Sequence, residues 1–436
     1  MSKEAPVDTT VPLTLAAAPK LRCIDQLRGL AALWVTLYHA DGSFWRTSAT
    51  LFDGKAADFF HTQPLAHIVS AFVFGLGYFG VPLFFIISGF CIHLPLAGNS
   101  RPLNVRAFAI RRFFRLYPLY ITITALCMAL YWIRDGWGHN PQLTFGSVIG
   151  HLFFWHYFAS PPDPGMGVSP VLWTLSLEVE FYILYALLLP LLRRIGFGRC
   201  ALIGIVIGIA YRTVWYSNSS LDPHWDEQWP RIFYPSRFVF IRFGEWLLGA
   251  WLAELYARRS PTGIIRFPWS NPALLAGGCF CIIFGVAFAI FCGLDRYATD
   301  LLASVGFALI TLVAIRADAA SQAKGPTPVS WWQRLGTFLG DRSYSLYLIH
   351  FSAIVTTVEV VARLAHVAAR KDSMGGTPVW LLAVCLGTAM AFIGAEFTYR
   401  FIEAPSHEFA RKLVRRFEQR SVRLATARAD PVTAHQ

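Results

Sequence analysis

The sequence predicts an all-α protein, a polytopic transmembrane bundle of about ten spans with one short interfacial or re-entrant segment. The chain is 55% hydrophobic and only 15% charged, whereas soluble globular chains are about 25% charged. Its apolar residues gather in blocks of roughly 18 to 25, the length that crosses a bilayer as a helix. Lys and Arg concentrate in alternate connections between these blocks, as the positive-inside rule requires.

The expected spans cover residues 24–42, 70–94, 113–133, 171–192, 199–217, 237–256, 272–292, 299–316, 337–363 and 377–401. The run "FGSVIGHLFFWHYF" (145–158) carries His151 and His156 and is shorter than the others. A run of that size more often lies in the interface or re-enters. Counting it as a span would place the basic run 193–199 outside, against the loop charge.

This topology puts both termini in the cytoplasm. It divides the chain into a cytoplasmic tail (1–23), a transmembrane domain (24–405) and a basic cytoplasmic tail (406–436). We expect the second tail to fray and to contact anionic lipid. The net charge of +12 lies in alternate loops and in this tail, so the lipid bilayer is the expected partner and nucleic acid is not.

The eight cysteines have no CxxC or CxxC…HxxH spacing, so we expect neither a disulfide framework nor a metal site. The sequence also lacks the GxxxxGK[ST], HExxH and GxSxG patterns. The usual signals of ATP-driven transport, zinc proteolysis and serine hydrolysis are therefore missing. A histidine inside a span, without a nucleophilic Ser or Cys motif, is suited to direct acyl or phosphoryl transfer.

The first span, in "RGLAALWVTLYHA", carries Arg28 and His39. At roughly 100° per residue their spacing returns both side chains to one helix face, about 16 Å apart along the axis. Ionisable groups inside a span are costly and normally face the bundle interior. A snorkelling flank arginine and a structural histidine are the alternatives.

The third span begins with "AIRRFFRLYPLY", which contains Arg111, Arg112 and Arg115. Arg112 and Arg115 are three residues apart and share a helix face. Three guanidinium groups within about one turn, on the same side of the membrane as Arg28, are suited to hold a polyphosphate. An ordinary positive-inside signal is the alternative.

The fourth span contains Glu178 and Glu180 in "LWTLSLEVEFYILY". Glu178 lies roughly 10 Å from the outer end of its helix, a depth that matches that of His39. We therefore expect Glu178 to pair with His39, fix its tautomer and raise its basicity. A buried structural ion pair is the alternative.

Three further blocks carry polar or helix-breaking residues. In "GDRSYSLYLIHF", Ser343, Tyr347 and His350 share one stripe, and Tyr344 adds a polar tip nearby. In "GVPLFFIISGFCIHL", small residues favour close helix packing. In "FIEAP", Pro405 is expected to end the last span.

Read together, six blocks resemble the acyltransferase 3 family of integral membrane O-acyltransferases. The blocks are "IDQLRGLAALWVTLYH", "GVPLFFIISGFCI", "RRFFRLYPLY", "LWTLSLEVEFY", "SYSLYLIHF" and "FIEAP", from Ile24 to Pro405. No single block is specific, but the set in this order is. The resemblance identifies 24–405 as a transmembrane acyltransferase domain.

The resemblance implies a transferase of the inner or plasma membrane. Such an enzyme moves an acyl group, acetyl by family habit, from cytoplasmic acyl-CoA to a hydroxyl of a carbohydrate or glycoconjugate, with no bound cofactor. The implied catalytic residues are His39 and Glu178, and the implied acyl-CoA ligands are Arg28, Arg112 and Arg115. Trp173, Ser343, Tyr344 and His350 are implied to support the site.

Two alternatives stay open at this stage. His39 could act as a general base on the acceptor or carry the acyl group itself. The same charged groups could instead line the path of a transporter or a flippase of a lipid-linked glycan, in which no bond is made. Turnover of acyl-CoA by the purified protein separates these classes.

Overall fold

A computed structural model describes residues 21–45, 74–135, 145–155, 169, 171–222, 234–235, 237–292, 296–325, 328–365 and 378–429. The predicted tail up to residue 20, the start of the second span (70–73), His156 and residues 430–436 lie outside these ranges. The longer helices are α1 (Arg22–Trp45), α5 (Gly80–His93), α6 (Val105–Asp135), α8 (Trp173–Ile195), α9 (Phe197–Leu221), α11 (Val239–Ala257), α12 (Asn271–Cys292), α13 (Arg296–Ala323), α15 (Ser343–Leu364), α17 (Pro378–Thr398) and α18 (Ala404–Ala429). Shorter elements are η1 (Gly75–Phe79), η2 (Leu94–Leu96), α7 (Phe145–Leu152), α14 (Trp331–Asp341) and the π-helical turn η4 (Tyr399–Glu403).

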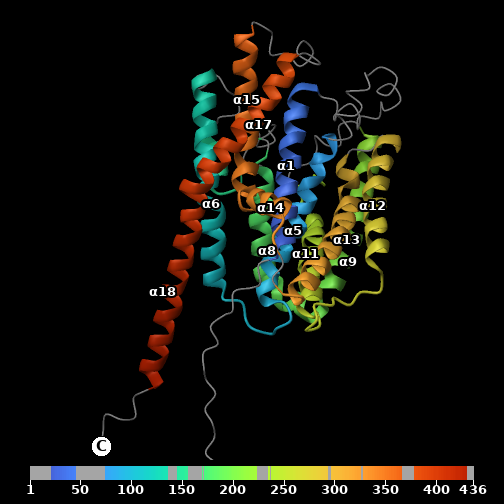
Figure 1. Ribbon diagram of the computed structural model, residues 1–436, viewed down its shortest axis with the longest axis vertical. Helices are drawn as coiled ribbons and strands as arrows, with labels where there is room; N and C mark the ends of the chain where they lie inside the picture. Colours follow the sequence, from blue (N-terminus) through green and yellow to red (C-terminus); the bar gives the residue numbers. More distant parts are fainter. Residues whose placement is uncertain are drawn as a thin grey trace, which may run out of the picture.

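The prediction of an all-α polytopic bundle is confirmed (Figure 1). Within the described ranges, eight helices are long and apolar enough to cross a membrane. The other two predicted spans correspond to α1 and α11, which carry several ionisable side chains. α7 has eight residues and is about 12 Å long, too short to cross the hydrocarbon core, as expected for the short segment.

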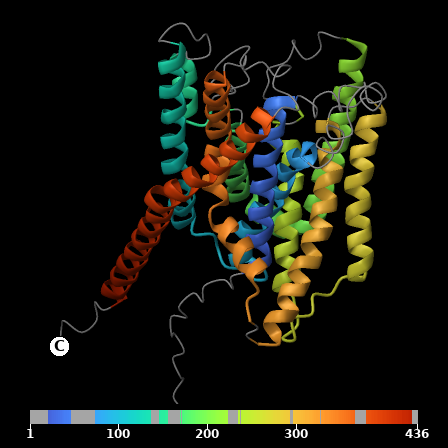
Figure 2. The same cartoon turned by 45° about the horizontal axis from the view of Figure 1, so that its top comes forward.

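The connections at 97–104 and 258–270 lie at the same end of the bundle, the lower end in Figures 1 and 2. Both contain arginine, so the positive-inside rule predicts that this end faces the cytoplasm. α6 starts at this end and α8 finishes there (Figure 1). The alternation of helix direction therefore agrees with the loop-charge pattern.

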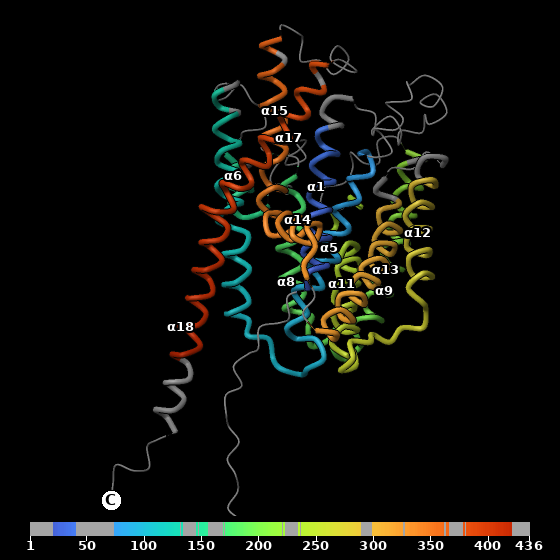
Figure 3. Tube along the Cα trace, viewed as in Figure 1, coloured from blue at the N-terminus to red at the C-terminus, as the bar shows by residue number. Residues whose placement is uncertain are grey.

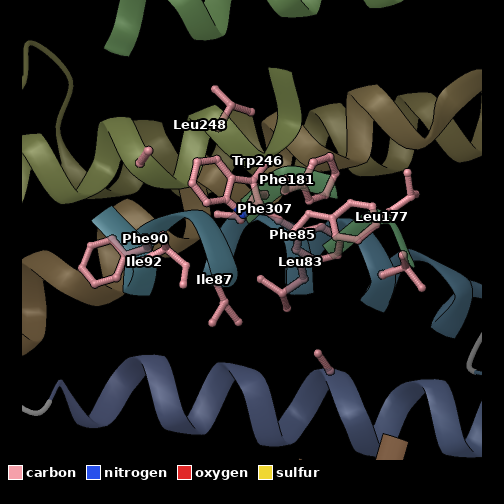
Figure 4. Packing of buried hydrophobic residues seen from close by; sticks show 14 of the residues in the cluster. Leu83, Phe85, Ile87, Phe90, Ile92, Leu177, Phe181, Trp246, Leu248 and Phe307 are labelled. Carbon is pink, nitrogen blue, oxygen red and sulfur yellow. The ribbon is translucent and has the colours of Figure 1, made fainter. Parts of the chain in front are cut away.

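The centre of the bundle is the crossing of α5 and α11. Trp246 of α11 is fully buried, and its ring centroid lies 5.6 Å from that of Phe243 and 5.3 Å from that of Tyr185 (Figure 4 shows the surrounding side chains). The backbones can meet this closely because each helix presents a glycine. A Cβ on Gly89 would lie 2.0 Å from the Trp246 carbonyl oxygen, and one on Gly249 1.8 Å from that of Ile86.

A buried charge cluster joins α9, α11 and α13. Arg212 lies 2.9 Å from both Glu245 and Asp300, and Arg242 pairs with the same two carboxylates. Ser304 donates a further hydrogen bond to Glu245 at 2.9 Å. Two cations face two anions, so the cluster is neutral, which is the condition for placing charges in an apolar interior. Its members come from three separate segments, so no local sequence pattern indicates the cluster.

The prediction of one continuous span at 337–363 is wrong, since a break at Arg342 separates α14 from α15. The Gly340 carbonyl oxygen, near the end of α14, accepts from Arg28 Nε at 3.0 Å, from Arg28 Nη2 at 2.7 Å and from Ser343 Oγ at 2.8 Å. These side chains occupy an acceptor that a continuous helix would give to a backbone N–H. α14 packs tightly on α1 (Figure 3), and a Cβ on Gly340 would lie 2.1 Å from the Asp25 carbonyl oxygen.

Pro405 does not end the last helix, contrary to expectation. It lies in the first turn of α18, which follows η4 without a loop. A proline within continuous helix removes one backbone hydrogen bond, and here the π-helical turn directly before it is a local irregularity of the kind that accompanies such a loss. Residues 406–429, expected to fray, continue as helix, and the first half of this helix packs on α6 (Figures 1 and 2).

The α5–α11 crossing generates a stability prediction. Gly249→Ala places a methyl group against backbone atoms of Ile86 and Phe90 that cannot move separately from their helix. We expect a loss of roughly 1–3 kcal/mol, seen as a lower unfolding temperature of the detergent-purified protein. The matched control is Gly277→Ala on α12, where the new Cβ would meet only Leu309 Cδ1 at 3.6 Å. Equal melting temperatures for the two variants would contradict this account of the crossing.

Candidate functional site

The structure contains a cavity of about 550 Å³ between α1, α5, α6, α8, α15 and the start of α18. Eight residues singled out in the sequence line it together: Arg28, Arg111, Arg112, Arg115, Glu178, Ser343, Tyr344 and Tyr347. These residues come from four helices far apart in the chain. The fold therefore brings the predicted arginines and the predicted carboxylate to one cavity, and their roles stay a prediction.

The cavity wall carries a large excess of positive charge. Its lining includes one carboxylate, that of Glu178, and the guanidinium groups of Arg28, Arg111, Arg112, Arg115 and Arg411. Arg111 and Arg411 are exposed, whereas Arg112 and Arg115 are half-buried, so the charges run from the protein surface inward. A partly enclosed space of this kind favours a polyanion.

Arg112 illustrates the excess charge. Its Nε is buried and has no hydrogen-bond partner, and its guanidinium lies 5.7 Å from the centroid of the Tyr182 ring and 5.8 Å from that of Phe108. An unpaired buried donor costs free energy in the empty protein. Such a group is suited to gain its partner from a bound ligand.

Arg28 has a partly structural role. Besides its bonds to the Gly340 carbonyl oxygen, its Nη2 pairs with Asp25 at 3.2 Å. Its side chain is 19% exposed and still lines the cavity. One residue therefore fixes the junction of α14 and α15 and contributes charge to the site.

Glu178 is held in place by the bundle core. It accepts a hydrogen bond from Ser88 Oγ at 3.2 Å and another from the Tyr182 hydroxyl. Ser88 in turn accepts from Trp246 Nε1 at 3.3 Å. These contacts fix the carboxylate on the cavity wall.

His39 is paired with His350, not with Glu178. The His39 Nδ1 lies 3.0 Å from the Val35 carbonyl oxygen and 3.1 Å from His350 Nε2. The His350 Nδ1 lies 3.1 Å from the Leu346 carbonyl oxygen. A carbonyl oxygen only accepts, so each Nδ1 carries the proton when the rings are neutral. This assignment leaves Nε2 as the basic nitrogen of His39.

The expected pairing of His39 with Glu178 is wrong because the two residues lie at different levels in the bundle. Thr174 Oγ1 lies 2.8 Å from the Tyr347 hydroxyl, which sets the level of α8 against α15. Glu178 lies one turn below Thr174, about 6 Å away, whereas His350 lies almost one turn above Tyr347. The matching depths inferred from the sequence assumed that all helices begin at the membrane surface.

Tyr347 connects the cavity to the histidine pair. It lines the cavity, and its ring centroid lies 5.8 Å from that of His350. The Phe84 ring packs against it at 5.4 Å. Thr174 also lines the cavity, so its hydrogen bond with Tyr347 is part of the wall next to His350.

The remaining predicted residues are mainly structural in their contacts. Ser343 donates to the Gly340 carbonyl oxygen, and the Tyr344 hydroxyl donates to that of Leu116 at 2.7 Å. Both also line the cavity. Trp173 is buried in the hydrophobic core at the first turn of α8.

Two lining residues, His407 and Arg411, were missed by the sequence analysis. They lie in the segment interpreted as a frayed tail. The available signal was the spacing of four residues, which puts both on one helix face directly after "FIEAP". In the part of the chain that the structure describes, no group of three or more His, Cys, Asp or Glu side chains could hold a metal ion.

Comparison with known proteins gives a family match over most of the chain. The family model described as an acyltransferase domain, acyltransferase 3, matches residues 21–396. The peptidoglycan O-acetyltransferase OatA of Listeria monocytogenes is 27% identical over 402 residues, which are 88% of this chain and 55% of that protein.

Two further relatives are similar to this chain at comparable levels of sequence identity. The putative peptidoglycan O-acetyltransferase YrhL of Bacillus subtilis is 27% identical, over 76% of this chain and 50% of that protein. A putative O-acetyltransferase of Staphylococcus aureus is 23% identical, over 88% of this chain and 56% of that protein. The chain thus spans about half the length of these curated relatives. No solved structure matches.

Arg28 makes structural hydrogen bonds and Arg112 Nε makes none, a difference that can be tested on the protein without ligand. Arg112→Met removes a buried charge whose Nε has no partner, so we expect an unchanged or higher unfolding temperature. Arg28→Ala removes two hydrogen bonds from the Gly340 carbonyl oxygen, and we expect a loss of roughly 1.5–3 kcal/mol. Thermal unfolding in detergent, without ligand, measures both. An Arg112→Met protein as destabilised as Arg28→Ala would show that Arg112 holds the fold instead of awaiting a ligand.

Proposed function

The chain belongs to the acyltransferase 3 family, and from this premise we propose that it transfers an acetyl group from cytoplasmic acetyl-CoA to a sugar hydroxyl. The observation that carries the proposal is a single cavity with arginines at its exposed end and a histidine pair beyond its inner end. Coenzyme A has the same polarity. Its phosphates lie at the nucleotide end and its thioester at the tip of a long, flexible arm.

The arginines are suited to the nucleotide end of the donor. Guanidinium groups bind phosphate through paired, charge-assisted hydrogen bonds. Arg112 and Arg115 lie on one face of α6 and project into the cavity, and Arg28 adds charge from α1. The arm would then run along the wall that Glu178 and Ser88 form, where the carboxylate can accept from the arm's amide N–H groups.

The proposed reaction is direct transfer with His39 as general base. Its Nε2 takes the proton of the acceptor hydroxyl while the hydroxyl oxygen attacks the thioester carbonyl carbon. The carbon–sulfur bond breaks, and the thiolate of coenzyme A leaves and recovers the proton. The Tyr347–Thr174 contact must open for the thioester to reach His39. His350 keeps the proton of His39 on Nδ1 throughout.

The acceptor is proposed from the relatives. Two of them are named as peptidoglycan O-acetyltransferases, and we propose a hydroxyl of a cell-envelope polysaccharide that approaches from the membrane face opposite the donor. Loop charge supports this direction, because the exposed arginines lie toward the end of the bundle predicted to face the cytoplasm.

Turnover separates this proposal from transport without bond chemistry. Purified protein in lipid nanodiscs, given acetyl-CoA and a soluble peptidoglycan fragment, is expected to release free coenzyme A and acetylate the fragment. A transporter would do neither. Coenzyme A release without acetylation would retain the donor and reject this acceptor.

His39→Ala is expected to lower the transfer rate by roughly 10²–10⁴-fold and to leave coenzyme A binding unchanged, because His39 lies beyond the cavity that binds the donor. Transfer and binding are both measured on a variant with wild-type thermal stability. A stable variant that still transfers at the wild-type rate would reject the mechanism. Recovery of a labelled acetyl group on His39 of the wild-type protein would favour the acyl-histidine route instead.

His350 is predicted to be a positioning residue. His350→Leu removes one of the two acceptors for His39 Nδ1 and leaves only the Val35 carbonyl oxygen, so we expect kcat to fall and the pH profile of kcat to change, with KM for acetyl-CoA constant. His350→Gln keeps an acceptor oxygen on a side chain of similar length and should restore part of kcat. A purely structural role predicts instead that both variants lose activity in proportion to their loss of thermal stability.

A further inference from the structure

The C-terminal helix α18 is part of the cavity wall. His407, Ala410 and Arg411 line the cavity, and their spacing of three and four residues puts them on one helix face. Sequence alone suggested that this segment only contacts lipid. Its contribution to a binding cavity therefore needs a separate explanation.

The first half of α18 is held against α6 by two aromatic contacts. The Phe409 ring lies 5.0 Å from that of Phe114, and the Arg106 guanidinium lies 3.9 Å above the ring of Phe417. Residue numbers rise along one helix as they fall along the other, so the two are antiparallel (Figures 1 and 2). Arg411 therefore faces the arginine-rich start of α6.

The side chain of His407 also suggests a bound ligand. Its Nε2 is buried and has no hydrogen-bond partner. Four cations act on it electrostatically, namely Arg115, Arg112, Arg411 and Arg28. The buried carboxylate of Glu403, one turn earlier, balances part of the charge of Arg115 and Arg28, and a bound anion would balance the remaining cations.

The positions of the arginines give an order for the phosphates. Arg411 and Arg111 are exposed, and Arg112 and Arg115 are half-buried. Arg115 is one turn, about 6 Å, further along α6 than Arg111. A donor whose arm points inward therefore presents its diphosphate to the deeper pair and its ribose end to the outer pair.

Resting on the donor proposed above, we propose that α18 completes the donor site and that Arg411 binds the 3′-phosphate on the ribose of coenzyme A. His407 donates from its ring to the neighbouring phosphate oxygens. α18 then distinguishes coenzyme A from dephospho-coenzyme A, which is identical except that it lacks this phosphate.

The test measures the affinity of the full-length protein in nanodiscs for coenzyme A and for dephospho-coenzyme A. Wild type is expected to bind coenzyme A the more tightly. Arg411→Ala should weaken coenzyme A binding roughly ten- to hundredfold, with no change for dephospho-coenzyme A. Arg112→Ala should weaken both, because it removes a contact to the diphosphate. Arg416→Ala is the matched control, since Arg416 is exposed on the same helix and does not line the cavity.

The outcomes distinguish the role of α18 from the identity of the donor. Equal affinities in wild type, or an Arg411→Ala protein that keeps the full preference for coenzyme A, would overturn the role of α18 and leave the donor intact. Wild-type protein that binds neither compound would reject the donor and this inference with it. Arg411→Gln gives the same readout through a polar side chain if the alanine variant loses thermal stability.

Discussion

The contact between Arg28 and the Gly340 carbonyl oxygen is the interaction on which the site depends. A guanidinium inside a membrane protein needs acceptors. The guanidinium of Arg28 donates two hydrogen bonds to the Gly340 carbonyl oxygen near the end of α14. The break that results lets α15 begin inside the bundle. Ser343 and Tyr344 then reach the cavity, and His350 reaches the level of His39.

Buried charges occur in two arrangements in this protein, a balanced cluster and a cavity with an excess of arginine. Around Glu245 and Asp300, two arginines and two carboxylates are buried and balanced, and this cluster joins three helices. In the cavity the arginines greatly outnumber the carboxylates, and Arg112 keeps a donor without a partner. An apolar environment tolerates such an excess only where water or a ligand can reach it. The imbalance, more than the presence of charge, distinguishes the candidate site from the rest of the bundle.

The histidine pair shows how neutral groups can set up a base without a carboxylate. Backbone carbonyl oxygens at Val35 and Leu346 hold a proton on each Nδ1. Both carbonyls belong to the preceding turn of the same helix, so the arrangement is built into α1 and α15. Glu178 does not orient His39. Its carboxylate is held on the cavity wall by Ser88 and Tyr182.

The sequence by itself determined the helical class, the order of the spans and the helix faces that carry Arg28, Arg112, Arg115 and Glu178. Block length, loop charge and helix periodicity are local properties, and each helix obeys them separately. Tertiary structure decided what depends on the relative heights of helices: the break at Arg342, the partner of His39, and the place of Arg411 in the cavity wall. Periodicity gives the face of a residue but not the depth at which its helix starts. That depth is set by contacts between distant segments, such as Arg28 with Gly340 and Phe114 with Phe409.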